Sequence, residues 1–166
     1  MPAVPTGKRK EAAILKATLL AYTQMIPVAA EDAPLSLGAG TPQENLIEYA
    51  GRVCYRSDAL MGRSPTFISA RVREGHEDII EHVRFVFRVE RASLDRTLLM
   101  LASQPTVQYT DLGDDVWVFS MNARNIRDFW VKTNSQLAQE LMRLAAVVVP
   151  AVFVDASTSF RDEANI

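Results

Sequence analysis

Between residues 83 and 90, large apolar side chains alternate with mostly polar ones. The apolar positions are Val83, Phe85, Phe87 and Val89. Successive side chains of a strand point to opposite faces of the sheet, so this spacing predicts a β-strand with one strongly apolar face. Such a face has to be covered by another layer of structure. The chain therefore needs a sheet with a second layer of structure on at least one side.

Two helices are predicted before this strand by their start signals. Thr41-Pro42 places a capping hydroxyl before a proline at the first helical position, and the apolar spacing continues to about Cys54. Ser64-Pro65 repeats the signal and begins a helix that ends near Gly75. Cys54 has the spacing of the buried face of the first helix, so we expect it to pack in the core and not to act as a nucleophile.

The remaining segments are assigned by weaker patterns. Residues 11–23 are mostly apolar and fit either a strand or a helix, and residues 24–40 are rich in proline and glycine and fit a loop. Further elements are expected as a short helix over 92–102, a strand over 115–120, and helices over 122–131 and 135–147 that break near Thr133-Asn134. The sum predicts an α+β fold, with a small sheet flanked by helices.

The domain organisation follows from length and from the polar ends. A chain of 166 residues fits one domain, which we place at residues 11–155. Residues 1–10 are expected to form a flexible tail and residues 156–166 a polar C-terminal tail.

Composition excludes several classes of protein. The net charge of −2 gives no general attraction to nucleic acid or to an anionic membrane, and the basic run at residues 8–10 fits a solvated tail. A single cysteine excludes an intrachain disulfide and a four-cysteine zinc site. The longest apolar run, residues 144–154, contains a proline and is too short to span a bilayer. We expect a cytoplasmic protein with no nucleic-acid or membrane partner.

The two histidines do not predict a metal site. His76 and His82 are six residues apart, about 240° around an α-helix, whereas a zinc-binding helix needs a spacing of four. Local hydrogen bonds in a turn are the simpler interpretation for His82. For His76, local hydrogen bonds and contact with a cofactor remain equally open.

Four blocks, in this order, carry a resemblance to a known family. They are residues 19–23 (LLAYT), 75–87 (GHEDIIEHVRFVF), 121–129 (MNARNIRDF) and 138–139 (AQ). The second block resembles a Gly-His turn followed by Glu-His and an alternating aromatic strand, and the third resembles an Asn-Ala-Arg helix start. Together they resemble the flavin-dependent thymidylate synthase family.

The resemblance implies a fold and a chemistry. The implied fold is a twisted, mostly antiparallel sheet with helices, assembled as a homotetramer, with residues 19–23 in its opening strand. The implied cofactor is FAD, lying across subunit interfaces. The implied reaction is the reductive methylation of dUMP to dTMP, with NADPH as reductant and a folate as carbon donor.

The resemblance also assigns site residues. The positions matching the flavin side of the family's site are His76, Asp78, Glu81, Asn122, Arg124 and Asp128. The positions matching its nucleotide side include Thr106, Gln108 and Tyr109. Asp78 stands where the family has a small hydroxyl residue, and a carboxylate there would repel a flavin phosphate.

Several positions depart from the family pattern. The family's Arg-His-Arg triad reads Leu99-Met100-Leu101, and its pyrimidine-binding arginine matches Thr133, beside Lys132. A nearby family histidine matches Leu137, and only twelve residues separate Tyr109 from Asn122, where the family has a longer covering segment. Leucine offers no donors to phosphate, so the family activity is expected to be altered or lost. The alternative is a non-catalytic structural or regulatory homologue that forms an oligomer.

Overall fold

The computed structural model describes residues 15–26, 39–91 and 96–154. The two expected tails, residues 1–10 and 156–166, lie outside the described residues. The domain boundaries therefore stay predictions.

A four-stranded antiparallel sheet confirms the predicted α+β fold. Its strands follow the order β1-β2-β4-β3. Their bounds are β1 Leu15–Tyr22, β2 Arg84–Arg91, β3 Gln108–Gly113 and β4 Val116–Asn122. The apolar segment at 11–23 thus contains a strand, which the resemblance implied and the residue pattern alone left undecided. The strand expected over 115–120 corresponds to β4.

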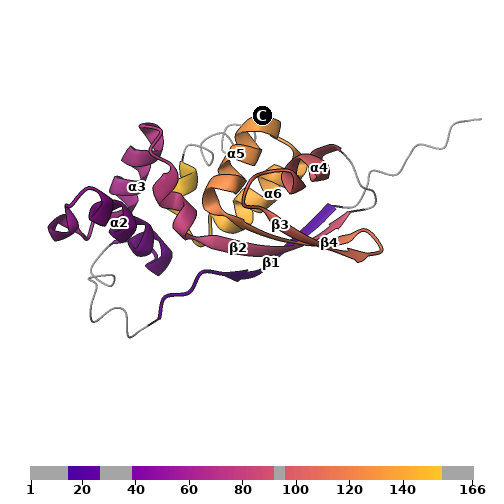
Figure 1. Ribbon diagram of the computed structural model, residues 1–166, viewed down its shortest axis with the longest axis horizontal. Helices are drawn as coiled ribbons and strands as arrows, with labels where there is room; N and C mark the ends of the chain where they lie inside the picture. The colour runs from indigo at the N-terminus through magenta and orange to yellow at the C-terminus, as the bar shows by residue number, and fades with distance from the viewer. Residues whose placement is uncertain (1–14, 27–38, 92–95, 155–166) are drawn as a thin grey trace, which may run out of the picture.

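The apolar face of β2 lies at the centre of the core, as its alternation predicts. Phe85, Phe87 and Val89 are fully buried, and they pair in register with Met121, Phe119 and Trp117 of β4, respectively. Helices α5 and α6 lie over this face of the sheet, while α2 and α3 lie beyond one end of it (Figure 1).

Strand β3 was not expected. It forms a hairpin with β4 through Asp114 and Asp115, whose φ angles of 51° and 58° are those of a type I′ turn. Every residue of β3 is exposed, so its sequence has no apolar alternation by which to recognise a strand. This hairpin occupies the short stretch between Tyr109 and Asn122.

The helices begin and end close to the predicted positions, but Ser64 is the first residue of α3 and not its cap, since Arg63 occupies the N-cap position. Their bounds are α2 Pro42–Cys54, α3 Ser64–Arg73, α4 Arg96–Ala102, α5 Ala123–Thr133 and α6 Gln136–Ala145. Short 3-10 helices are η1 Asp58–Leu60, η2 Asp78–His82 and η3 Pro150–Phe153. The predicted break between the last two α-helices is confirmed, because Asn134 ends α5 in the left-handed conformation and Ser135 caps α6.

The buried face of α2 corrects the expectation for Cys54. Cys54 is exposed, because α2 turns a largely polar face toward the interior. Glu44 and Glu48 lie on that face together with Gln43 and Asn45. Burial of carboxylates requires hydrogen-bond donors, which here come from other parts of the chain.

Glu48 accepts hydrogen bonds from three segments. The Arg52 side chain donates from Nε and Nη2 at 3.2 Å, and the Ser64 hydroxyl donates at 2.7 Å. The backbone N–H groups of Gly62 and Arg63 complete the set, at 3.2 Å and 3.0 Å. This carboxylate therefore fixes the loop before α3 and the first residue of α3 against α2.

Two further features concern the described residues only. None of their helices is long and apolar enough to cross a membrane. They also contain no group of three or more His, Cys, Asp or Glu side chains arranged to hold a metal ion.

Replacing Glu48 by alanine should destabilise the protein severely. The change leaves the largely buried Arg52 guanidinium and the N–H groups of Gly62 and Arg63 without this acceptor, which should lower the free energy of unfolding by about 3–5 kcal/mol. Urea denaturation followed by circular dichroism measures the loss. The matched control is Glu140→Ala, since Glu140 also pairs with an arginine of its own helix, but Arg143 is 62% exposed. That variant should lose less than about 1 kcal/mol, and equal losses would contradict the assigned role of Glu48.

Candidate functional site

The η2–α5 cluster consists of Glu77, Glu81, Arg124, Arg127 and Asp128. Sheet pairing brings its two halves together, because Arg84 at the start of β2 faces Asn122 at the end of β4. The segment entering β2 therefore lies beside the start of α5. A hydrogen bond of 3.0 Å from the Ala123 N–H to the Val83 carbonyl fixes this junction.

Ion pairs join the halves of the cluster. Arg124 Nη1 lies 2.6 Å from Glu81 Oε1, and its Nε lies 3.9 Å from Asp128 Oδ2. Arg127 Nε lies 3.0 Å from Glu77 Oε1 in a more buried pair. The hydrogen bond that Arg124 donates to Glu81 raises the pKa of the Arg124 guanidinium, partial burial opposes the shift, and the nearby carboxylate charges reinforce it.

The charges of the η2–α5 cluster limit what it can bind. Two arginines face three carboxylates, so the cluster as a whole does not attract anions. The Arg124 side chain is 42% exposed, however, and exposed ion pairs are worth only about 0–1 kcal/mol. Arg124 can therefore exchange Glu81 for an anionic ligand at little cost.

His76 lies apart from the ion pairs. Gly75, with φ of 78°, ends α3 in a conformation that suits glycine, and His76 follows it outside the helix. The His76 ring stacks on Tyr55, and its Nδ1 lies 2.9 Å from the Tyr55 hydroxyl. Asp78, at the start of η2, is exposed. His76 thus has a protein hydrogen-bond partner and an exposed ring, and its contact with a cofactor stays a prediction.

Asn122 serves as the N-cap of α5. Its side chain is buried and accepts a hydrogen bond of 2.8 Å from the Asn125 N–H. Asn125 returns the contact by accepting from the Asn122 N–H at 3.1 Å, which completes a capping box. The predicted helix start is confirmed, and the side-chain oxygen of Asn122 is engaged in capping.

Asn125 has a structural role that was not predicted from the sequence. Its Nδ2 donates to the Pro105 carbonyl at 3.0 Å, and its Oδ1 accepts from the Thr106 hydroxyl at 3.0 Å. Thr106 has φ of 66°, an uncommon conformation for a β-branched residue. Asn125 therefore holds the turn before β3 against α5. The Asn-x-x-Asn spacing of a capping box was the available signal.

The three residues assigned to the nucleotide side lie on or before β3. The Thr106 hydroxyl donates its hydrogen bond to Asn125. Gln108 and Tyr109 are exposed, and the Tyr109 ring lies 6.0 Å from that of Phe119. Among the described residues, none of these three lines the pocket that follows.

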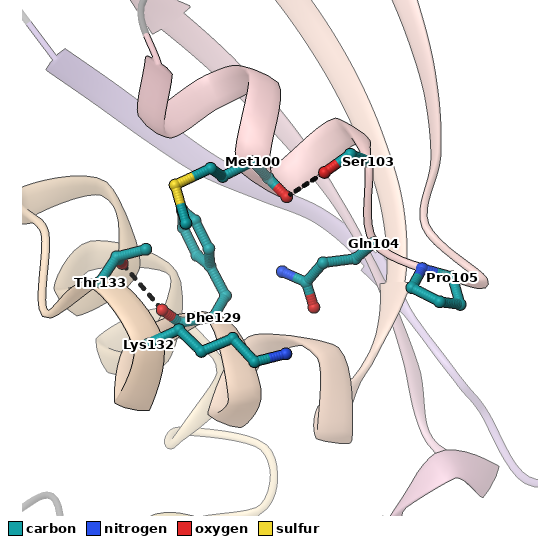
Figure 2. Close-up of a pocket in the computed structure, with 7 residues that line it drawn as sticks. All are labelled: Met100, Ser103, Gln104, Pro105, Phe129, Lys132 and Thr133. Carbon is teal, nitrogen blue, oxygen red and sulfur yellow. Dashed lines mark hydrogen bonds between the residues drawn. The ribbon is translucent and has the colours of Figure 1, made fainter.

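A pocket of about 230 Å³ opens between α4 and α5, and we call it the α4–α5 pocket (Figure 2). Met100, Ser103, Gln104 and Pro105 line it from the end of α4 and the turn that follows. Phe129, Lys132 and Thr133 line it from α5.

The α4–α5 pocket unites two segments that the resemblance assigned to nucleotide binding. Met100 comes from the position of the Arg-His-Arg triad, and Thr133 from that of the pyrimidine-binding arginine. The other two triad positions do not line the pocket: Leu101 is fully buried, and Leu99 is 53% exposed. Leu137 is fully buried in the core and adds no polar group.

Comparison with known proteins supports part of the resemblance, including the block at residues 75–87. Residues 36–99 match the family model described as thymidylate synthase complementing protein. The match confirms the resemblance over that segment, which includes α2, α3, η2 and β2. No curated protein matches the chain.

Replacing Asn125 by alanine should loosen the start of α5 and the turn at Pro105 together. It removes part of the capping box and leaves the Pro105 carbonyl and Thr106 hydroxyl without this partner, so the free energy of unfolding should fall by about 2 kcal/mol. Thermal and urea denaturation measure the change. Asn134→Gly is the control, because glycine readily adopts the left-handed conformation at that C-cap. A loss no larger than that of the control would show that Asn125 holds nothing in place.

Proposed function

We propose that the whole chain is a divergent relative of the flavin-dependent thymidylate synthases that binds FAD at the η2–α5 cluster. In that family the activity is FAD-dependent reductive methylation of dUMP to dTMP, and in this chain it is altered or lost. NADPH and a folate would be needed only if methylation is retained. The assembly we propose is a homo-oligomer, a tetramer as the resemblance implies, and its compartment is the cytoplasm.

One observation carries this proposal. Glu81 and Arg124 are 43 residues apart in the chain, and their side chains lie 2.6 Å apart. The resemblance assigned both to the flavin side from two separate sequence blocks. Asp128 lies in the same ion-pair group, which brings together half of the six assigned residues.

The donors of this region fit a flavin nucleotide. Arg124 offers a partly exposed guanidinium for a phosphate, and the exposed His76 ring offers a polar aromatic surface. Asn122 would act indirectly, by fixing the start of α5. Bound FAD would supply electron transfer that protein side chains cannot provide.

The surplus of carboxylates works against tight binding. Asp78 is exposed, and Glu81 competes with any anion for Arg124. We therefore expect FAD to bind more weakly than in a site where arginines outnumber acids. The exposed carboxylates also make the affinity depend on salt, because screening weakens both the attraction and the repulsion.

The altered activity follows from the α4–α5 pocket. Lys132 is the only basic side chain among its lining residues, where the family pattern has several cations. Each charge-assisted hydrogen bond contributes about 1.5–3 kcal/mol, so the loss of two arginines would weaken nucleotide binding about 100-fold or more.

A non-catalytic oligomer is the second candidate. Leu99 and Met100 are adjacent on α4 and are 53% and 38% exposed. Exposed apolar residues in place of phosphate-binding groups favour contact with another protein surface over contact with a charged substrate.

The test is to add FAD to the purified protein, remove the excess by gel filtration, and record the visible spectrum and the molar mass of the eluted protein. We expect flavin to co-elute with an oligomer. The Arg124→Gln variant should bind FAD about tenfold more weakly, because it loses one charge-assisted contact. Arg143→Gln, on the exposed side of α6, is the control and should bind normally.

The outcomes separate the two candidates. A colourless oligomer would refute flavin binding and support the non-catalytic function. A colourless monomer would contradict both. Flavin binding that Arg124→Gln leaves unchanged would place the flavin away from the η2–α5 cluster.

A further inference from the structure

We propose that the α4–α5 pocket binds a small carboxylate with an apolar body. The inference goes beyond the proposed function, since it concerns a ligand of different chemistry from a nucleotide and does not require bound flavin. It rests on the groups that line the pocket and on their existing hydrogen bonds.

The floor of the α4–α5 pocket is apolar. Phe129 is only 1% exposed, and Met100 adds a thioether side chain from α4 (Figure 2). Pro105 adds an apolar ring at the opposite side. An apolar group that enters here leaves water and gains contacts with aromatic and thioether atoms.

Two hydroxyl groups of the pocket are already used as donors. The Ser103 hydroxyl donates to the Met100 carbonyl at 3.0 Å, and the Thr133 hydroxyl donates to the Phe129 carbonyl at 2.8 Å. Neither hydroxyl is free to donate to a ligand without breaking the bond that it already makes.

Lys132 and Gln104 supply the remaining donors. Within the described part of the chain, neither the Lys132 ammonium nor the Gln104 side-chain amide has an ion-pair or hydrogen-bond partner. Figure 2 shows the Gln104 amide pointing into the space between α4 and α5, on the side where Lys132 extends. One cation and one amide donor can hold the two oxygens of a single carboxylate.

This donor set favours a carboxylate over a phosphate monoester. A phosphate monoester carries close to two negative charges near neutral pH and has three acceptor oxygens. A single lysine neutralises only one charge, and no arginine lines the pocket. A monoanion with two oxygens therefore matches the charge and the number of donors better.

The size of the pocket limits the apolar body. A volume of about 230 Å³ is below the range of roughly 300–1,000 Å³ typical of sites for drug-sized ligands. An aromatic ring with one carboxylate is small enough to enter a pocket of this size.

Benzoate is the probe that tests the proposal. The flavin-free, full-length protein labelled with ¹⁵N is titrated with benzoate, and amide chemical shifts report both the site and the dissociation constant. We expect the largest shifts at residues 99–106 and 128–134, with saturation. In the Lys132→Gln variant the dissociation constant should rise about tenfold, because one charge-assisted contact is lost.

Matched variants and probes make each outcome decisive. Lys16→Gln, an exposed lysine on β1, should bind benzoate as the unmodified protein does. Met100→Trp should abolish binding by filling the pocket, and benzyl alcohol should bind weakly and equally to the unmodified and Lys132→Gln proteins.

Three results would overturn the proposal. The first is benzoate binding that Lys132→Gln leaves unchanged, and the second is a set of shifts centred outside the pocket. The third is tighter binding of phenyl phosphate than of benzoate, which would identify a phosphate site. All three readouts are independent of flavin, so a colourless protein that binds benzoate would refute only the proposed function.

Discussion

The burial of two carboxylates on α2 sets the relative positions of the helices. Glu44 accepts hydrogen bonds from the Thr41 N–H at the start of α2 and from the Ala151 N–H of η3, 107 residues later in the chain. Glu48, one turn further along, accepts hydrogen bonds from the loop before α3. A carboxylate leaves water only when donors replace its hydration, so α3 and η3 have little freedom to move away from α2. Helix α2 also packs against η2, and Glu81 of η2 and Glu77 just before it form ion pairs with α5. The position of the candidate flavin site thus depends on acids that are not part of it.

The fold was predictable where the signal lies within a few neighbouring residues. The alternation through Phe85 and Phe87 predicts β2, and the cap at Thr41 predicts the start of α2, because both signals are local. The exposed strand β3 gave no such signal, since it is held by backbone pairing to β4 and buries little. The buried face of α2 was also unpredictable from periodicity. Glu48 reads as a surface residue until the distant donors that satisfy it are known.

The candidate site divides in the same way. Glu81 and Arg124 were predicted from the resemblance. Their ion pair could not be predicted, because it depends on the register between β2 and β4. Lys132 and Gln104 carry no motif, since their importance comes from a shared pocket and from the absence of other partners in the described chain. Asn125 lies between these cases. Its capping spacing was readable in the sequence, but its hold on the turn at Pro105 depends on where β3 begins.

Helix α5 connects the two proposed sites and explains why they can change independently. Arg124 lies in its first turn and Lys132 in its last, about 12 Å apart along the axis at 1.5 Å per residue. The helix is fixed by its capping box and by Phe129 and Ile126 in the core, and neither contribution needs Arg124 or Lys132. A substitution at an exposed lining position such as Met100 therefore changes the charge of the pocket without disturbing the fold. A scaffold fixed by buried acids and caps can retain one binding surface while the chemistry of its neighbour is replaced.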